Sequence, residues 1–395
     1  MDGTAVSLLR RITPVVHRID HALGRMSPRR DVLVEMRTPV YQAVLGPIAA
    51  ALAREPDVHL WYTSESPDRL RPLLPEGRFL THADVEWRRF DLYINADPWA
   101  AARLRRCAHR VNFFHGVAGK YDLDQPVGLP LGFEHYDRVG FINRDRMTRY
   151  LNARIVTQTQ AVLVGYPKLD ALVSGALDGG SVRASLGLAP GRPTALYAPT
   201  YSEASSLHLA GEAIVEALVA AGANVIVKLH DRSLDPDPKY NAGVDWRARF
   251  RTVEQVHAGR VRFVESPDAS PLLAAADCMV TDHSSVGFEY LVLDRPLLIF
   301  DAPELPRTAR INMEKVVLLR SAAAVVRTAA ELAGATVRAL ENPAHLSAVR
   351  RQVAETLFHD PGRATTRSVS LVLGLLRPSA IEPVGSPQPG RKEVS

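Results

Sequence analysis

Residues 275–300 read Ala275-Ala-Asp-Cys-Met-Val-Thr-Asp-His-Ser-Ser-Val-Gly-Phe-Glu-Tyr-Leu-Val-Leu-Asp-Arg-Pro-Leu-Leu-Ile-Phe300, which predicts a strand, a polar turn, a helix and a second strand. The apolar run at 278–280 predicts the first strand, and the run at 296–300 predicts the second. Between them, residues 286–293 have the spacing of an amphipathic helix. Strand, helix and strand in this order form the unit from which parallel sheets are built.

The turn in this stretch, Thr281-Asp282-His283-Ser284-Ser285, is suited to bind an anion. Two hydroxyls and several free backbone N–H groups converge at the start of the helix, where the helix dipole is positive. The alternative is a serine that only caps the helix, with Glu289 further along. The turn by itself does not decide between the two interpretations, and its neighbours favour phosphate binding.

The composition is that of a soluble globular protein with two domains. The chain has 395 residues, of which 46% are hydrophobic and 23% charged, and its net charge of +5 is basic but not extreme. Arginine far outnumbers lysine, which suits contact with phosphates or an anionic surface. Cys107 and Cys278 lie far apart, so we expect neither a disulfide framework nor a metal cluster, and a reducing, cytoplasmic setting. The sequence contains no apolar run of about 18 residues, so we expect no membrane span, and we expect no secretion signal.

Strands and helices alternate along two stretches of the chain. This alternation predicts an α/β fold with two Rossmann-like, doubly wound domains that face a central cleft. We expect a basic amphipathic helix at 1–27, a first domain at 28–178, a second domain at 179–377 and a disordered tail at 378–395. The N-terminal helix fits either an anionic membrane surface or packing on the first domain.

The expected elements follow from short apolar runs and helical spacing. Strands are predicted at 31–36, 58–63, 91–95, 111–114 and 161–164, and in the second half at 195–198, 225–229, 261–264, 278–280, 296–300 and 316–319. Helices are predicted at 39–54, 148–155, 211–221, 244–257, 271–276, 286–293, 323–340 and 344–357.

Polar side chains of the second half fall where its predicted strands end. Thr200 follows the first strand, Lys228 and His230 close the next, and the turn at 281–285 closes a later one. Ligands of doubly wound sheets bind at this edge. Backbone amides and serine hydroxyls there suit the oxygens of a nucleotide diphosphate, with His230 as a further donor.

In the first half, His115 follows an apolar strand and stands before Gly116, Gly119 and Lys120. A histidine that faces the cleft can act as a general base near neutral pH. The alternative is a structural histidine that caps a loop. Gly116 and Gly119 permit close backbone approach, and we expect Gly116 and Lys120 on the path of the acceptor.

These motifs together resemble the CDP-glycerol glycerophosphotransferases of teichoic acid and capsule synthesis. The resemblance covers about residues 110–370, and its motifs are Phe114-His115-Gly116, Gly165-Tyr166-Pro167-Lys168-Leu169-Asp170, Leu196-Tyr197-Ala198-Pro199-Thr200, Lys228-Leu229-His230, Thr281-Asp282-His283-Ser284-Ser285 and Phe358-His359-Asp360-Pro361-Gly362-Arg363-Ala364. Before residue 110, only the alternation of strands and helices matches.

The resemblance implies a GT-B fold and a metal-independent transfer, without a cofactor, of a polyol phosphate from a CDP-activated donor. It implies that His115 is the base and that His230, Ser284 and Ser285 hold the diphosphate, while Thr281 and Asp282 shape the turn. Thr200, Lys228 and Glu289 complete the expected donor site.

The same resemblance implies an acceptor that is a membrane-anchored anionic glycan or a lipid-linked polymer. We therefore expect a peripheral enzyme on the cytoplasmic face of the cell membrane. The donor is CDP-glycerol or CDP-ribitol, and CMP is the product released.

Three positions depart from the family's usual residues. Val117 stands in place of a threonine, Asp231 in place of a proline and His283 in place of a tyrosine. The first change concerns the acceptor side, and the other two alter the charge expected beside the diphosphate.

Other functions fit parts of the pattern. The turn at 281–285 also resembles that of UDP-N-acetylglucosamine 2-epimerases, for which Asp97 and Glu134 are the obvious acidic candidates in the first half. Sugar-nucleotide glycosyl transfer and a catalytically silent nucleotide-binding module are further alternatives. Nucleic-acid binding is not expected, because the basic residues are scattered.

Overall fold

The computed structural model describes residues 27–96, 104, 106–116 and 132–377. The expected N-terminal helix, apart from its last residue, lies outside these ranges, as do Asp97, Val117, Gly119, Lys120 and the tail at 378–395.

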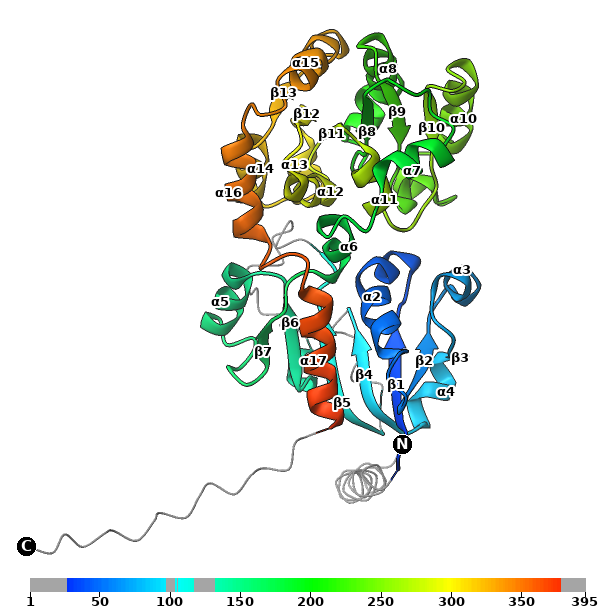
Figure 1. Cartoon of the computed structure of the whole chain (residues 1–395), viewed down its shortest axis with the longest axis vertical. Helices are drawn as coiled ribbons and strands as arrows, with labels where there is room; N and C mark the ends of the chain where they lie inside the picture. The colour runs from blue at the N-terminus through cyan, green and yellow to red at the C-terminus, as the bar shows by residue number, and fades with distance from the viewer. Residues whose placement is uncertain (1–26, 97–103, 105, 117–131, 378–395) are drawn as a thin grey trace, which may run out of the picture.

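The first half contains a seven-stranded parallel sheet of order β3-β2-β1-β4-β5-β6-β7 (Figure 1). Its central strands are buried along most of their length, which explains why they appear in the sequence as continuous apolar runs. The strands are β1 (Arg30–Glu35), β2 (Val58–Thr63), β3 (Arg78–Leu80), β4 (Phe90–Asn95), β5 (Cys107–Phe113), β6 (Arg138–Phe141) and β7 (Ala161–Leu163).

The helices of the first half are mostly short and follow the strands. They are α2 (Gln42–Leu52), α3 (Pro67–Leu70), α4 (His82–Trp87), α5 (Arg144–Asn152) and α6 (Asp170–Val173), with 3-10 helices η1 (Pro39–Tyr41), η2 (Arg71–Leu73), η5 (Phe133–His135) and η6 (Pro167–Leu169). Local signals set their ends: Asn143 accepts a hydrogen bond from the Arg146 N–H and so begins α5 four residues before the predicted start.

The second half contains a six-stranded parallel sheet of order β10-β9-β8-β11-β12-β13. β8 and β11 pair with each other at the centre, so the stretch at 275–300 supplies an inner strand of this sheet. The strands are β8 (Thr194–Tyr197), β9 (Asn224–Val227), β10 (Val261–Phe263), β11 (Cys278–Thr281), β12 (Leu297–Phe300) and β13 (Ala324–Val326).

Helices follow the strands of this half as the alternation predicts, and the last of those named next packs on the first half instead. They are α7 (Gly179–Ser185), α8 (Ser206–Ala220), α9 (Pro238–Asn241), α10 (Trp246–Val256), α11 (Ser270–Ala275), α12 (Ser285–Tyr290), α13 (Leu305–Thr308), α14 (Met313–Ser321), α15 (Ala329–Glu341), α16 (Ser347–Leu357) and α17 (Ala364–Leu376), with 3-10 helices η7 (Asp231–Leu234) and η8 (Leu291–Leu293).

One predicted strand is wrong. Residues 316–319 belong to α14, and the last strand of the sheet is β13, where a helix was expected to begin. Four apolar residues in a row suit a strand or a buried helix equally well. The helix prevails because Asn312 caps it by accepting from the Glu314 N–H, while Val316 and Leu319 point into the core one turn apart.

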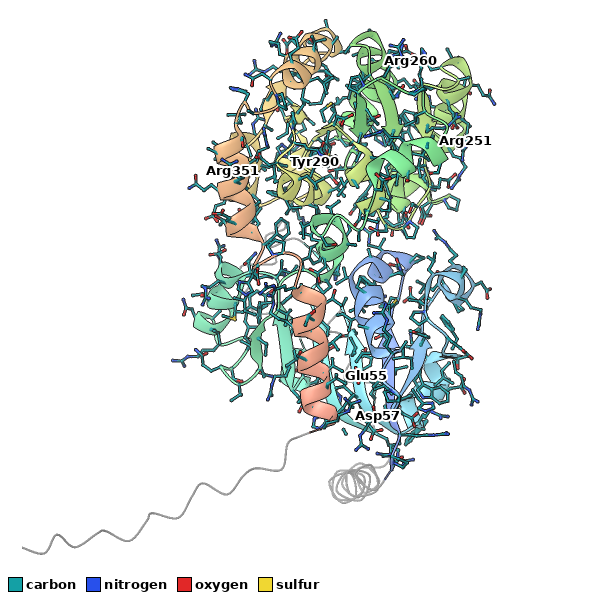
Figure 2. All side chains as sticks on the ribbon, in the orientation of Figure 1. Glu55, Asp57, Arg251, Arg260, Tyr290 and Arg351 are labelled. Atoms are coloured by element: carbon teal, nitrogen blue, oxygen red, sulfur yellow. The ribbon has the colours of Figure 1, made fainter. Side chains whose placement is uncertain are left out.

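The last helix returns to the first half. α17 packs against α2 and β4, although the sequence placed 179–377 in the second domain. At its end, Arg377 forms ion pairs with Glu55 (3.0 Å) and with Asp57, which lie beside the end of α17 in Figure 2. At its start, the Asp170 carboxylate accepts from the backbone N–H groups of Gly362, Ala364 and Thr365.

Buried apolar residues form a core that continues from the first half into the second, and a second core lies within the second half. None of the helices in the described ranges combines the length and the apolar character needed to cross a membrane.

Candidate active site

The carboxyl edges of the two sheets face each other. Three ion pairs between side chains that follow strands of opposite sheets demonstrate this: Lys168 with Glu289 (2.7 Å), Arg69 with Asp231 (3.8 Å) and Arg149 with Glu314 (3.2 Å). The polar motifs of the sequence therefore meet between the two halves, as ligand sites of doubly wound sheets do.

Asp282 is the centre of the polar turn after β11. It is fully buried, and its carboxylate accepts hydrogen bonds from the N–H and hydroxyl of Thr200, from the N–H and hydroxyl of Ser206, and from the N–H of His283. A buried carboxylate requires such partners. Burying even a neutral polar group without a hydrogen bond costs about 2–7 kcal/mol, and burying an unpaired charge costs more. Asp282 thus fixes the ends of β8 and β11 relative to each other.

The hydroxyls of Thr281 and Thr200 also form hydrogen bonds within the protein. The Thr281 hydroxyl is buried and donates to the Ala198 carbonyl at 2.7 Å, while the Thr200 hydroxyl donates to Asp282 at 2.6 Å. These bonds suit the implied role of Thr281 and Asp282 in shaping the turn. Thr200 takes part in the same network, and direct contact of these three residues with the donor stays a prediction. His283 is likewise buried.

Ser284 and Ser285 differ from these residues because they are partly exposed at the start of α12. Ser284 occupies the position before the helix with an extended backbone, yet its hydroxyl makes no capping hydrogen bond with any described residue. The hydrogen bond that a purely structural cap would make is therefore not found among the described residues. Both hydroxyls remain positioned at the facing edge, where a ligand oxygen can reach them.

Lys228 and His230 follow β9. The Lys228 ammonium donates to the Leu229 carbonyl at 2.8 Å and lies 3.9 Å from Asp231. Burial lowers the pKa of Lys228 below its ordinary value, and the Asp231 carboxylate opposes that shift. His230 begins η7, where its Nδ1 accepts from the Arg232 N–H at 3.1 Å, and its ring lies 4.8 Å from that of Tyr201.

Glu289, predicted as a donor contact, is buried on α12 and forms its ion pair with Lys168. Burial raises the pKa of the Glu289 carboxyl above its ordinary value, and the ammonium of Lys168 opposes this rise. In this structure Glu289 therefore joins α12 to η6, and its direct contact with a donor stays a prediction.

Lys168 belongs to residues 165–170, which we call the linker motif, and this motif touches both edges. The Tyr166 hydroxyl donates to the His115 carbonyl at 2.8 Å, and its ring stacks on Phe358 with centroids 6.2 Å apart. Gly165 has a φ of +88°, and a Cβ there would lie 2.6 Å from the His359 carbonyl oxygen. A glycine is required at this position because other residues rarely adopt that backbone conformation.

His115 lies exposed at the end of β5. Its Nδ1 is 2.7 Å from the Ala96 carbonyl oxygen, which only accepts, so Nδ1 carries the proton. In the neutral ring, the basic lone pair is then on Nε2. The Tyr41 ring lies 4.8 Å away and limits how the imidazole can turn. This arrangement provides what a general base needs: a fixed tautomer and an accessible ring.

Gly116 sits in open space, since a Cβ there would meet no described atom within 4 Å. Close packing against the described residues therefore does not explain the glycine, and a place for Gly116 on the path of the acceptor stays a prediction.

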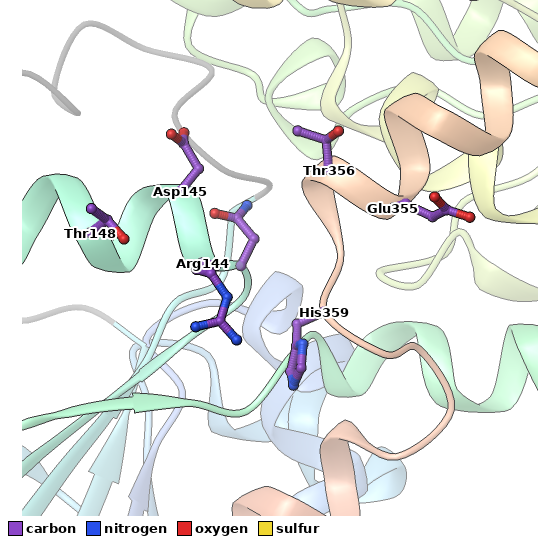
Figure 3. Close-up of a pocket in the computed structure, with 7 residues that line it drawn as sticks. Arg144, Asp145, Thr148, Glu355, Thr356 and His359 are labelled. Atoms are coloured by element: carbon purple, nitrogen blue, oxygen red, sulfur yellow. The ribbon is translucent and has the colours of Figure 1, made fainter.

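Two cavities between the halves contain none of the predicted site residues. The first has a volume of about 470 Å³ and is lined by Asn143, Arg144, Asp145, Thr148, Glu355, Thr356 and His359, drawn in Figure 3. The second, about 370 Å³, lies beside the link between α16 and α17. No three His, Cys, Asp or Glu side chains of the described residues lie together in an arrangement that would hold a metal ion.

Sequence reasoning missed three residues at these edges. Lys168 stood within a motif but had no assigned role, and its partner Glu289 lies on a distant element. Arg69 belongs to no motif, so nothing in the sequence pointed to it. Asp231 was noted as a departure, without a prediction of its partners Arg69 and Lys228.

Comparison with known families gives the class of the enzyme. The family described as CDP-glycerol:poly(glycerophosphate) glycerophosphotransferase matches residues 133–374, more than half of the chain. The protein therefore belongs to this family, and it is an enzyme of the CDP-glycerol glycerophosphotransferase type. No curated protein sequence matches the chain.

Solved structures similar to this chain share its fold. The wall teichoic acid polymerase TagF is 15% identical with a TM-score of 0.67, and the alignment covers 94% of this chain and 97% of that chain. A variant of TagF soaked with CDPG gives a TM-score of 0.66 at 15% identity over the same shares. A UDP-GlcNAc 2-epimerase from Neisseria meningitidis bound to UDP-GlcNAc is 13% identical, with a TM-score of 0.58, covering 87% of this chain and 100% of that chain.

These findings confirm the predicted family, enzyme type and GT-B-like fold class. CDP-glycerol is the donor that the family description names. The individual site residues are not tested by the comparisons, and their roles stay predictions.

Proposed function

We propose that this enzyme transfers glycerol phosphate from CDP-glycerol to a membrane-associated polymer or lipid-linked acceptor of the cell envelope, of teichoic acid or capsule type, and releases CMP. Membership of the glycerophosphotransferase family supports the donor and the reaction. Similarity in fold to a wall teichoic acid polymerase supports the class of acceptor. We expect the enzyme to work as a peripheral protein on the cytoplasmic face of the membrane.

The observation that supports this proposal most is the state of His115. Its Nδ1–H donates to the Ala96 carbonyl, which leaves the basic lone pair on Nε2, where it would accept a proton. In the proposed reaction, the acceptor hydroxyl oxygen bonds to the β-phosphorus while its proton passes to Nε2. The bond between that phosphorus and the bridging oxygen breaks, and CMP leaves with the oxygen.

The second half would bind the donor. Ser284 and Ser285 supply hydroxyls at the facing edge, and His230 and Lys228 supply nitrogen donors from the neighbouring strand end. The charge that develops on the departing CMP needs fixed donors, because phosphoryl transfer is catalysed mainly by positioning and electrostatic stabilisation. The buried bonds of Asp282 would hold these groups in place before the donor arrives.

The division of labour follows from these roles. Residues 28–178, with His115, would form the acceptor domain, and residues from 179 onward would form the donor domain, with α17 packed back on the acceptor domain. The N-terminal residues 1–27 and basic side chains would contact the membrane.

The experiment that tests this proposal measures CMP release from CDP-glycerol and CDP-ribitol, with bacterial membranes as acceptor. CMP release from CDP-glycerol that requires membranes supports the proposal, and preferential use of CDP-ribitol would correct the donor. CDP-glycerol binding by calorimetry without CMP release would favour the silent module.

The epimerase remains a second candidate because the fold is shared. Glu134, its acidic candidate among the described residues, lies in η5 just before β6. That position is the amino edge of the first sheet, opposite to the edge that faces the second half. The geometry thus favours transfer, and incubation with UDP-N-acetylglucosamine tests the alternative.

A further inference from the structure

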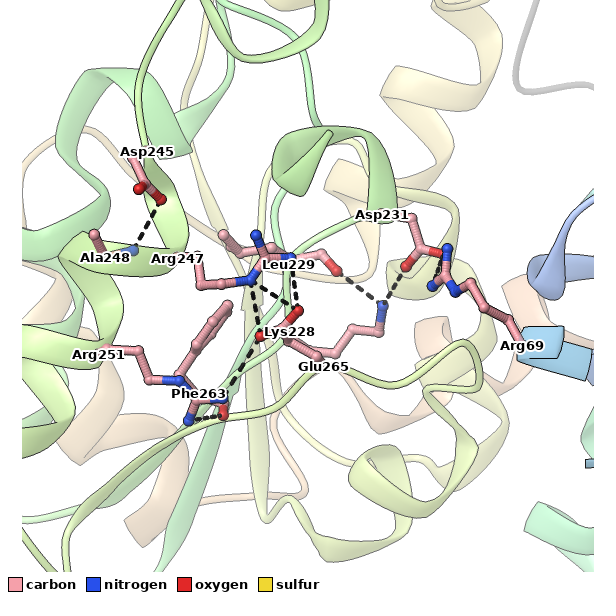
Figure 4. Close-up of polar contacts among 10 residues, drawn as sticks. All are labelled: Arg69, Lys228, Leu229, Asp231, Asp245, Arg247, Ala248, Arg251, Phe263 and Glu265. Carbon is pink, nitrogen blue, oxygen red and sulfur yellow. Dashed lines mark hydrogen bonds and ion pairs between the residues drawn. The ribbon is translucent and has the colours of Figure 1, made fainter. Parts of the chain in front are cut away.

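Arg69 extends from the first half to the motif that would bind the donor in the second half. It lies on α3, after the carboxyl end of β2, and its Nη2 is 3.8 Å from Oδ2 of Asp231 (Figure 4). Asp231 directly follows Lys228-Leu229-His230. The first half therefore places a guanidinium beside the expected diphosphate site.

Asp231 lies between two cations from opposite halves. Its Oδ1 is 3.9 Å from the Lys228 ammonium, while its Oδ2 faces Arg69 (Figure 4). Neither distance is that of a tight hydrogen bond, for which about 2.7–2.9 Å is usual between charged groups. The carboxylate thus holds both cations loosely at the edge where a ligand would enter.

The pair of Arg69 and Asp231 is open to competition. The Arg69 side chain is 64% exposed and that of Asp231 is 28% exposed. Ion pairs at exposed positions contribute little, because water and salt screen them. A diphosphate carries more negative charge than one carboxylate, and its oxygens match the planar guanidinium in two parallel hydrogen bonds.

We propose that Arg69 is a donor-binding residue contributed by the first half. Without donor, its guanidinium pairs with the Asp231 carboxylate, and the diphosphate of the donor then takes the place of that carboxylate. This inference rests on the proposed function, since it assumes a diphosphate beside Lys228 and His230. It adds that the donor is bound from both halves. Asp231 then acts as an internal competitor that weakens donor binding.

The test is a double-mutant cycle with CDP-glycerol binding measured by calorimetry. Arg69→Ala is expected to weaken binding about tenfold, which corresponds to about 1.4 kcal/mol. Asp231→Asn is expected to strengthen binding severalfold, because it removes the competing charge. In the Asp231→Asn background, Arg69→Ala should again weaken binding at least tenfold.

Arg71→Ala is the matched control. Arg71 is an exposed arginine two positions away whose guanidinium stacks over the Phe79 ring at 4.6 Å, so its loss should leave donor binding unchanged. Melting temperatures of all variants check that they fold.

The cycle separates the two roles that Arg69 could have. Loss of the Arg69→Ala effect in the Asp231→Asn background would show that Arg69 acts only through Asp231, and it would overturn the inference. The inference also fails if Arg71→Ala weakens binding as much as Arg69→Ala. In both cases wild-type binding of CDP-glycerol leaves the proposed function standing, whereas failure of the wild type to bind would overturn both.

Discussion

The two facing edges are built in opposite ways. The edge of the second half is organised by Asp282, a buried carboxylate that accepts from Thr200, Ser206 and His283, and the partly exposed Ser284 and Ser285 directly follow this turn. The edge of the first half presents His115 on the surface, with its Nδ1 against the Ala96 carbonyl. In the proposed roles, donor binding would depend on a network that also stabilises the fold, whereas proton transfer would depend on an exposed side chain.

The largest effect is expected from His115→Ala. Loss of a general base lowers the rate of transfer by about 10²–10⁴-fold. The melting temperature should fall only slightly, because the exposed side chain makes one hydrogen bond with the Ala96 carbonyl and one ring contact with Tyr41, and the affinity for CDP-glycerol should stay unchanged. CMP release and calorimetry measure the two quantities.

His135→Ala is the control for this prediction, since His135 is an exposed histidine at the amino edge of the same sheet. Equal loss of transfer and donor affinity in His115→Ala would contradict the contrast between the edges.

The next effect is expected from Asp282→Asn. An amide nitrogen cannot accept from the N–H groups of Thr200, Ser206 or His283, so at least one buried donor loses its partner. We expect the free energy of unfolding to fall by about 3 kcal/mol, with a parallel loss of donor affinity. Denaturant unfolding and calorimetry test this together.

Thr281→Val removes one buried bond, to the Ala198 carbonyl, and should cost about 1 kcal/mol. An Asp282→Asn protein with wild-type stability would show that the turn does not depend on the carboxylate.

Ser284→Ala should have a smaller effect than Asp282→Asn, and it should change donor affinity without changing stability. The hydroxyl caps no described N–H group, so its loss should leave stability unchanged and weaken CDP-glycerol binding about tenfold, or about 1.4 kcal/mol. Thr81→Ala provides the converse, because Thr81 does accept from the Asp84 N–H at the start of α4. That variant should lose about 1 kcal/mol of stability and no donor affinity.

The smallest effect is expected far from both edges, at the end of α17. Arg377→Ala should lower the free energy of unfolding by less than about 1 kcal/mol, because its partners Glu55 and Asp57 are at the surface. The hydrogen bond from Arg377 holds the pKa of Asp57 below its ordinary value. The contribution is therefore present above the ordinary pKa of an aspartate and is lost as the pH falls through the lowered value.

Transfer should be unaffected by Arg377→Ala. A change in CMP release would mean that the position of α17 is coupled to the facing edges.

Features that depend on neighbouring residues could be predicted from the sequence. Buried strands appear as apolar runs, and the residues after them fall at one edge of a parallel sheet, so the positions of His115, His230 and Ser284 at the facing edges follow from the order of residues alone. Features that depend on distant partners could not be found this way. The sequence places Asp282 in the turn but does not reveal its partners Thr200 and Ser206, and Lys168 has no evident role until Glu289 is seen beside it.

Errors arose where local signals were ambiguous. The apolar run at 316–319 fits a strand as well as it fits α14, and only the cap at Asn312 distinguishes them. No local sequence signal predicts that α17 packs on the first half, because the residue that holds its start, Asp170, lies almost two hundred residues earlier.

The return of α17 has a consequence for synthesis. On the ribosome, the first half emerges long before residues 364–376, which supply the helix that covers α2 and β4. The apolar surface beneath that helix therefore stays exposed while the whole second half is being translated, a period in which unfinished domains are prone to aggregate. The first half is translated first but completed last. A premature stop before Ala364 would therefore leave the first half without its covering helix.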